Sequence, residues 1–216
     1  MSLPAMFRGT AFSFDADKHE YRVGPNVVPN CTSVLATGGL VPFSMVSADI
    51  LERKSELGRE VHKACHLHNI GKLGSCDTEV KPYLDSWILF KSTKKFTPRL
   101  SEYQAIGELN GMCYGMQIDC SGELDGEDTV IEYKIGEILP HHGVQLAGYA
   151  IGLPHPRWSA PLARFAARKR IALQLRPGRM PHMEPFRERS DFYVFSALLY
   201  TSTWKKQFKN VYKEKE

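Results

Sequence analysis

Three residues near the middle of the chain have the side chains and the spacing to hold a divalent cation beside a phosphate. Asp119 precedes the turn sequence Asp-Gly-Glu-Asp, and Glu132 and Lys134 follow it. Side chains alternate along a strand, so Glu132 and Lys134 share one face, and the turn would fold Asp119 back beside them. Carboxylates bind Mg²⁺, the metal lowers the pKa of a bound water, and a lysine can orient or deprotonate that water. The spacing indicates metal-assisted phosphodiester hydrolysis, although surface strands often show the same triplet.

Two other acids, Glu123 and Asp125, are alternatives to Asp119 as the first carboxylate. Glu123 has the same parity as Asp119 along the expected strand, but it lies closer to the turn and therefore farther from Glu132. Asp125 belongs to the turn sequence itself. We therefore assign the metal-binding role to Asp119.

Two helical segments carry further polar residues that could join this site. Gln145 and Tyr149 are four residues apart on an expected helix, so they face the same direction. On an earlier expected helix, His62 follows Gly58 by four residues. Taken alone, a histidine in such a place is more often a surface or core residue than a metal ligand.

Taken together, these residues resemble the PD-(D/E)XK nuclease superfamily, most closely its RecB-type branch, which includes phage-encoded recombination exonucleases. The resemblance spans about residues 58–153 and consists of Gly58-x-x-x-His62, Asp119, Glu132-x-Lys134 and Gln145-x-x-x-Tyr149. The beginning of the chain is also similar to phage proteins of this type, in Phe14-Asp15, His19-Glu20-Tyr21 and Thr32-Ser33-Val34-Leu35. As a set these motifs are specific, whereas each one alone is not.

The resemblance implies a metal site and names its ligands. His62, Asp119 and Glu132 would bind the metal through their side chains, and Tyr133 through its backbone carbonyl. Mg²⁺ is the expected cofactor, with Mn²⁺ as its substitute. Some relatives also carry an iron–sulfur cluster built from one early and several late cysteines. This chain has 5 cysteines, none of them after Cys120, so we expect no such cluster.

The resemblance implies roles for four more residues around the metal. Lys134 would position or activate the hydrolytic water. Gln145 would hold the Lys134 region or contact the scissile phosphate, and Tyr149 would support the DNA strand. Glu102, in the preceding strand, resembles an accessory acidic position.

Charge is distributed unevenly along the chain. From residue 157 onward there are 14 Lys and Arg against 5 Asp and Glu, whereas the preceding residues hold 14 and 19. A basic third beside an acidic remainder indicates a polyanion-binding surface next to a carboxylate-rich site. The densest basic run, residues 164–170, predicts contacts to DNA phosphates from Arg164, Arg168, Lys169 and Arg170. A solvated strand entry explains that run nearly as well.

Hydrophobic periodicity and turn residues predict a mixed α/β domain. We expect a hairpin over 12–23, followed by an irregular stretch bracketed by Pro25 and Pro29. Helices are expected over 44–70, 79–91, 140–153 and 192–211, and strands over 99–108, 112–124, 129–135 and 170–175. The resemblance specifies this as a restriction-endonuclease-like mixed sheet with helices on both sides. We expect a single domain over 1–216, with an N-terminal extension (1–40), a nuclease core (44–156) and a basic C-terminal strand and helix (157–216).

These observations together predict a Mg²⁺-dependent DNA nuclease, an exonuclease of recombination or DNA end processing of the kind that phages encode. A structure-specific or restriction-like endonuclease is the alternative within the enzymes, and a non-catalytic DNA-binding module on the same fold is the alternative outside them. The expected partners are DNA and a single-strand annealing or recombination protein. Scattered cysteines and the lack of a signal peptide or long apolar run favour the cytoplasm of a bacterial or phage-infected cell, with no membrane partner. The sequence shows no sign of an oligomer interface.

Overall fold

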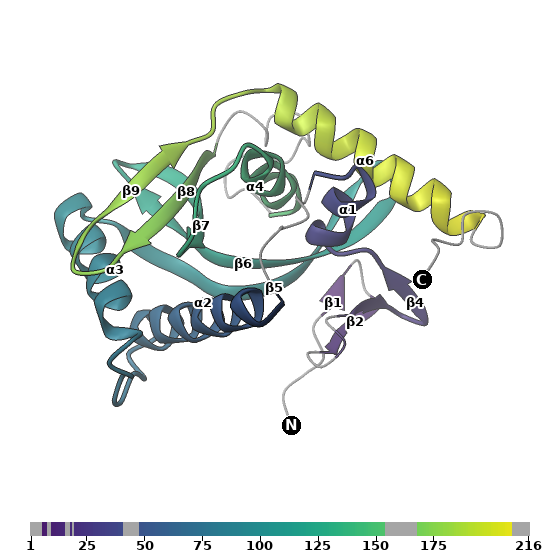
Figure 1. Cartoon of the computed structure of the whole chain (residues 1–216). Coiled ribbons are helices and arrows are strands. Elements are labelled where there is room, and N and C mark those ends of the chain that lie inside the picture. Colours follow the sequence, from purple (N-terminus) through teal and green to yellow (C-terminus); the bar gives the residue numbers. More distant parts are fainter. Residues whose placement is uncertain are drawn as a thin grey trace.

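The computed structural model describes residues 6–7, 10–15, 18, 20–40, 48–153 and 168–208. These residues form two sheets and a set of helices, shown in Figure 1. The strands are β1 (Met6–Phe7), β2 (Thr10–Asp15), β3 (Glu20–Val23), β4 (Asn26–Val28), β5 (Thr97–Leu109), β6 (Met112–Leu124), β7 (Glu127–Lys134), β8 (Lys169–Arg176) and β9 (Arg179–Pro185). The helices are α1 (Cys31–Thr37), α2 (Ala48–Asn69), α3 (Lys81–Lys94), α4 (His141–Gly152) and α6 (Ser190–Gln207).

The larger sheet is mixed and has the strand order β5-β6-β7-β8-β9. Strands β5, β6 and β7 are antiparallel neighbours, β7 and β8 run parallel, and β8 and β9 are again antiparallel. Both turns of the β5-β6-β7 meander have positive φ at their two central residues, Asn110-Gly111 and Asp125-Gly126. Asn-Gly and Asp-Gly favour this two-residue hairpin geometry, which explains why the sequence predicts both turns.

Helices cover both faces of this sheet, as Figure 1 shows. Helices α1, α4 and α6 pack against one face, which contributes Met116, Ile118 and Val130 to the shared core. Helices α2 and α3 pack against the other face, where Trp87 meets Tyr133. The predicted mixed α/β architecture with helices on both sides is therefore confirmed.

The N-terminal part forms a separate small sheet, β1-β2-β3-β4, that contains the predicted hairpin as β2 and β3. It meets the larger sheet where the Gly115 N–H donates to the Pro29 carbonyl, at 2.8 Å. The buried Tyr21 ring lies so close to Gly115 that a Cβ there would be 2.1 Å from the ring. Only glycine fits this approach, which brings β3 and α1 toward the middle of β6.

Three elements differ from the sequence-based expectation. Between Pro25 and Pro29, where an irregular stretch was expected, the chain forms the short strand β4. Helix α1 was not expected, and it forms because Asn30 and Ser33 cap its first turn reciprocally. Strand β9 was not expected, since it contains Pro181 and ends at Pro185. It pairs only with β8 in this sheet, and an edge strand tolerates proline because its outer amides need no partner.

The other predicted elements are confirmed with shifts of a few residues at their ends. The first long helix begins at Ala48 in the described region, and residues 41–47 lie outside that region. The last helix ends at Gln207 rather than at residue 211. In the part of the chain that the structure describes, no helix has the length and apolar character needed to cross a bilayer.

Candidate metal and catalytic site

The site begins where strands β6 and β7 separate. Their ladder runs from Leu124–Glu127 to Cys120–Ile131 and ends there, so Asp119 and Glu132 face each other without backbone pairing. The Asp119 carboxylate fills the gap, because its Oδ2 accepts a hydrogen bond of 2.7 Å from the Tyr133 N–H. A side chain thus takes the place of a strand carbonyl, and the sheet opens beside Glu132.

The Glu132 carboxylate, which is 4% exposed, is the centre of a group of polar side chains. Its Oε1 accepts hydrogen bonds from Lys134 Nζ at 2.8 Å and from Gln145 Nε2 at 2.9 Å. Gln145 also donates to the Tyr149 hydroxyl at 2.7 Å. The structure therefore brings together four residues that the sequence assigns to one site, from β7 and α4.

The second oxygen of this carboxylate, Glu132 Oε2, is buried and has no hydrogen-bond partner among the described residues. A buried oxygen of this kind is costly unless a partner compensates it. A divalent cation would supply that compensation. The orphaned oxygen therefore fits a metal ligand.

Helix α2 and strand β5 add two more ligands beside Asp119. His62 Nδ1 lies 3.3 Å from Asp119 Oδ1 and 3.6 Å from Glu102 Oε1. One ligand atom from each of these three residues lies within 4.8 Å of the others. A nitrogen and two carboxylate oxygens at this spacing could hold a metal ion.

The backbone of Glu102 has an irregular conformation where its side chain meets His62 and Asp119. It has a φ of +48°, in the left-handed region that non-glycine residues rarely adopt. Its neighbours pair as Ser101–Cys120 and Tyr103–Ile118, so Glu102 stands opposite Asp119. Strain at one residue is tolerated where the surroundings hold it. Here a short hydrogen bond from Gln117 Nε2 holds Glu102 Oε2, which leaves Oε1 toward His62.

Gln117 is the residue of this site that the sequence pattern does not single out. It has no motif of its own, and its role depends on a side chain in the neighbouring strand. Alternation of the strand places it on the same face as Asp119, which is the one signal that could have found it.

The protonation of the group shows how strongly its charges interact. Burial would lower the pKa of His62, but the charges and hydrogen bonds of Asp119 and Glu102 outweigh burial and raise it to about 10. Burial and the nearby Asp119 raise the pKa of Glu132 to about 7, against the opposing effect of Lys134. The raised pKa values favour a proton on His62 and on Glu132, and a bound cation could replace these protons.

The pKa values of Asp119 and Lys134 are likewise set by burial and by neighbouring charges, which act in opposite directions. Burial would raise the pKa of Asp119, but His62 and Lys134 lower it below its usual value. Burial would lower the pKa of Lys134, but Glu132 and Asp119 raise it. Lys134 is therefore a fixed positive charge beside Glu132.

Two hollows give access to these residues. One, of about 180 Å³, is lined by His62, Glu102, Asp119, Glu132, Gln145 and Tyr149, together with residues of β3, α1 and β6. The other, of about 440 Å³, follows α2 past Arg59, Lys63 and His66. Both include His62 and Glu102, so the candidate metal group lies at the junction of the two.

The alternative acids lie elsewhere. Glu123 is half exposed and makes a short ion pair with Arg99. Asp125 is exposed in the turn, with its carboxylate 3.5 Å from Lys169 Nζ. Neither residue lines the cavity that holds Asp119 and Glu132.

The predicted basic run takes a different form from the open surface that its sequence indicates. Arg168 is buried and donates to Asp128 Oδ2 at 2.6 Å, and Arg170 is buried and donates to Asp191 Oδ2 at 2.7 Å. Their positive charges are thus partly neutralised inside the protein, and the DNA contacts expected of these two residues stay a prediction. Lys169 is partly exposed, and Arg164 lies outside the described residues.

Comparison with known proteins finds similar solved structures but no matching sequence family. No family model matches the chain, and no curated protein matches its sequence. Among solved structures, the chain is similar to the crystal structure of SSO0001, with a TM-score of 0.35 and 18% identity, over 61% of this chain and 59% of that one. It is also similar to a structure named "Putative exonuclease" from Eubacterium rectale, with a TM-score of 0.48 and 10% identity, over 84% and 74% of the two chains. At these scores neither similarity carries an argument about function.

Proposed function

We propose that this protein is a Mg²⁺-dependent nuclease that hydrolyses phosphodiester bonds of DNA, acting as an exonuclease. The observation that carries the proposal is the convergence of His62, Glu102 and Asp119 within 4.8 Å, beside a buried Glu132 with one oxygen unpartnered. The exonuclease and DNA parts of the proposal rest on the sequence resemblance. The geometry supports the metal-dependent part.

The residues fit a hard divalent cation. His62, Asp119 and Glu132, with the Tyr133 carbonyl, are the ligands that the resemblance implies, and the geometry adds Glu102. A bound Mg²⁺ would supply a water of lowered pKa and neutralise charge on the phosphate. Mn²⁺ has the same preference for oxygen and nitrogen ligands.

The chain's own residues then orient the reactants. Lys134 places a positive charge and N–H donors 2.8 Å from Glu132 Oε1, where a phosphate bound beside Glu132 would accept them. Gln145 fixes Glu132 from the other side and is itself held by Tyr149. These contacts keep the side chains of Glu132 and Lys134 in place before substrate binds. Such pre-organisation is the main structural requirement of electrostatic catalysis.

Digestion of end-labelled linear duplex DNA with Mg²⁺, followed by sizing of the products, tests this proposal. Asp119→Ala, Glu132→Ala and Lys134→Ala should each abolish cleavage while the protein remains folded. Glu123→Ala is the matched control, because it removes an exposed acid from the same strand outside the cavity. Full Mg²⁺-dependent activity in the first three variants would contradict the proposal.

A closed circular substrate separates the two nuclease alternatives. An exonuclease needs a free end, so it should leave circular single- and double-stranded DNA intact and degrade the same DNA after linearisation. Cutting of the circles would instead identify an endonuclease that uses the same metal site. Salt-dependent DNA binding without any Mg²⁺-dependent cleavage would identify a non-catalytic binding module.

A further inference from the structure

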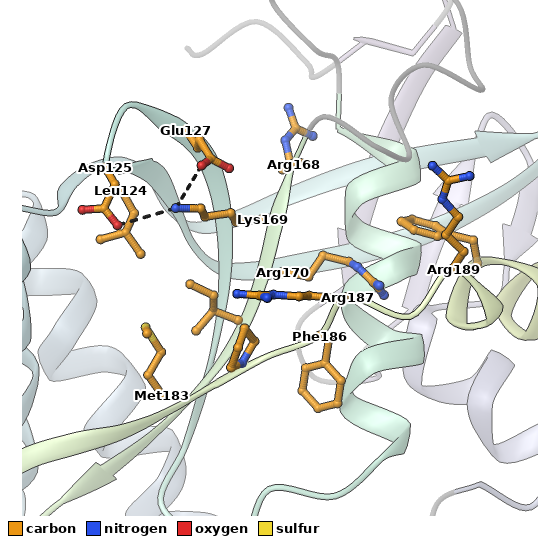
Figure 2. Close-up of a pocket in the computed structure, with 13 residues that line it drawn as sticks. Leu124, Asp125, Glu127, Arg168, Lys169, Arg170, Met183, Phe186, Arg187 and Arg189 are labelled. Atoms are coloured by element: carbon orange, nitrogen blue, oxygen red, sulfur yellow. Dashed lines mark ion pairs between the residues drawn. The ribbon is translucent and has the colours of Figure 1, made fainter.

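A third hollow, of about 710 Å³, lies at the other end of β7 from the metal site, and Figure 2 shows the residues that line it. It is bordered by the β6–β7 turn, the start of β8, and the segment that joins β9 to α6. No residue that lines it also lines the cavity around Asp119 and Glu132. Glu132 follows Glu127, which lines this hollow, by five positions along β7, and this corresponds to about 17 Å along the strand.

One wall of the hollow is made of buried arginines held in fixed positions. Arg168 bonds to Asp128, and Arg170 bonds to Asp191 at 2.7 Å and to the carbonyls of Gly143 and Glu188. The Arg170 guanidinium also lies 4.4 Å from the centre of the Phe192 ring. These contacts use most of the donors of Arg170, so this wall is rigid and its charge is largely balanced.

The segment between β9 and α6 carries two further arginines, whose positive charges are not paired with carboxylates in this way. Arg187 and Arg189 are exposed, and neither guanidinium has a carboxylate within 4 Å in the part of the chain that the structure describes. The carboxylate of Glu188, the residue between them, forms no ion pair with either guanidinium within that distance. In the view of Figure 2, the Arg187 side chain lies across the middle of the hollow.

This segment is anchored on both sides of the two arginines. The Phe186 N–H donates to the Arg170 carbonyl at 2.8 Å, the Glu188 carbonyl accepts from Arg170, and the Phe192 N–H donates to the Arg189 carbonyl at 3.1 Å. The backbone that carries Arg187 and Arg189 is therefore held before any ligand binds. Pre-organised cations lose less entropy on binding than mobile ones.

Lys169 is a third cation of the hollow, and its charge is paired with two exposed carboxylates. Its Nζ lies 3.5 Å from Asp125 Oδ2 and 3.2 Å from Glu127 Oε1, the two ion pairs drawn in Figure 2. Both carboxylates are well exposed, so these pairs are weak in water. An anionic ligand could compete for Lys169 at little cost.

The remaining lining is apolar and includes Met183, Phe186 and Ile171. The volume of this hollow lies in the usual range of a small-ligand site, and its lining joins several cations to a smaller apolar part. Guanidinium groups bind phosphate oxygens in a bidentate fashion, and an aromatic ring beside them can contact a base. The combination suits a phosphate that carries an organic part better than a bare inorganic anion.

We propose that this hollow is a phosphate-binding pocket for a nucleotide unit, with Arg187 and Arg189 as its principal contacts. The nucleotide unit can be part of a nucleic-acid strand or a free nucleotide, since both present the same phosphate ester. The pocket is separate from the metal site, so the proposal stands or falls independently of the nuclease activity.

Calorimetry without divalent cations tests this pocket while the metal site is inactive. The probes are inorganic tripolyphosphate, deoxyadenosine monophosphate and a short fluorescent oligonucleotide. We expect binding by the wild-type protein and a loss of about tenfold or more in affinity for the double variant Arg187→Ala/Arg189→Ala, since hydrogen bonds to charged groups each contribute this much. Arg179→Ala is the matched control, because Arg179 is an exposed arginine at the far end of β9, outside the pocket.

A second pair of substitutions distinguishes a binding role from a structural one. Asp125→Asn/Glu127→Gln frees Lys169 without removing any side chain, so it should strengthen binding of the same probes. A substitution that merely damaged the fold would weaken binding instead. Circular dichroism and thermal unfolding of each variant show whether the fold is intact.

Competition between the probes identifies the source of the phosphate. Displacement of the oligonucleotide by tripolyphosphate, lost in the double arginine variant, supports a nucleic-acid strand as the ligand. Binding of the mononucleotide with no effect of tripolyphosphate on the oligonucleotide supports a free nucleotide. If none of the probes binds, or if the double variant binds them all as tightly as the wild type, the proposal is wrong.

Discussion

Replacing Glu132 with glutamine should make the metal-free protein more stable while removing most of its response to Mg²⁺. Glutamine keeps an oxygen that can accept the hydrogen bonds from Lys134 and Gln145 but removes the charge. The rise in the Glu132 pKa from 4.5 to about 7 means that ionisation of this group is disfavoured in the folded protein. At about 1.4 kcal/mol for a tenfold change, the rise corresponds to roughly 3 kcal/mol.

The sign of this effect depends on pH. Because the folded pKa of Glu132 is raised, the folded state binds more protons than the unfolded state between pH 4.5 and about 7. Stability contributed by the protonated group is therefore full below pH 4.5 and is lost as pH rises through 7. The Glu132→Gln variant lacks this loss, so its advantage over the wild type should be near zero at pH 4.5 and greatest above pH 7.

Thermal unfolding at pH 5 and pH 8, with and without Mg²⁺, measures this difference. At pH 8 without metal, we expect the variant to unfold about 6–12 °C above the wild type, since a chain of this size shifts by about 2–4 °C per kcal/mol. Added Mg²⁺ should raise the Tm of the wild type by mass action and raise that of the variant much less. Glu123→Gln, at an exposed acid, should match the wild type in both respects.

Two results would refute this reasoning. One is a variant less stable than the wild type at pH 8 without metal, which would mean that the Glu132 charge is compensated inside the protein. The other is an equal Mg²⁺ response in the two proteins, which would place the metal elsewhere.

Three further perturbations test other parts of the site. Lys134→Met should reduce cleavage at least a hundredfold, while its affinity for Mn²⁺, measured by calorimetry, stays within a few fold of the wild type. A parallel loss of Mn²⁺ binding would assign Lys134 to the metal site itself. Glu102→Gly should relieve a strained φ and stabilise the metal-free protein by about 1 kcal/mol, because glycine favours this conformation. The same variant should bind Mn²⁺ about tenfold more weakly. Unchanged Mn²⁺ binding would exclude Glu102 as a ligand. The raised pKa of about 10 keeps His62 protonated, so His62 should release a proton when Mn²⁺ binds. The affinity for Mn²⁺ should therefore rise from pH 6 to pH 9, and the heat of binding should depend on the buffer. An affinity that does not change with pH, and that His62→Gln leaves unchanged, would exclude His62 as a ligand.

The sequence predicts the central part of the site well because short-range rules govern it. Asp125-Gly126 sets the hairpin, and strand alternation then places Glu132 and Lys134 on one face with Ile131 and Tyr133 on the other. Nothing beyond the local sequence is needed for this arrangement.

Other features depend on contacts that span long stretches of chain, so the sequence cannot give them. Arg168 and Arg170 bind carboxylates that are 40 and 21 residues away, and the sequence gives no sign that these partners would lie beside them. The left-handed backbone of Glu102 is likewise set by the neighbouring strand rather than by its own residue type. These are the places where packing of the whole domain overrides the local pattern.

The end of the β6–β7 ladder explains why stability and the proposed metal binding would oppose each other at this site. If the ladder continued, backbone groups would pair at Asp119 and Glu132, and the sheet would be closed. Instead the Asp119 side chain satisfies the Tyr133 amide, and a buried Glu132 is left with an unpartnered oxygen. Active sites often keep such destabilising groups because function requires them. A divalent cation that binds the opened edge would restore the lost stability, so metal binding and folding should be coupled at this point of the sheet.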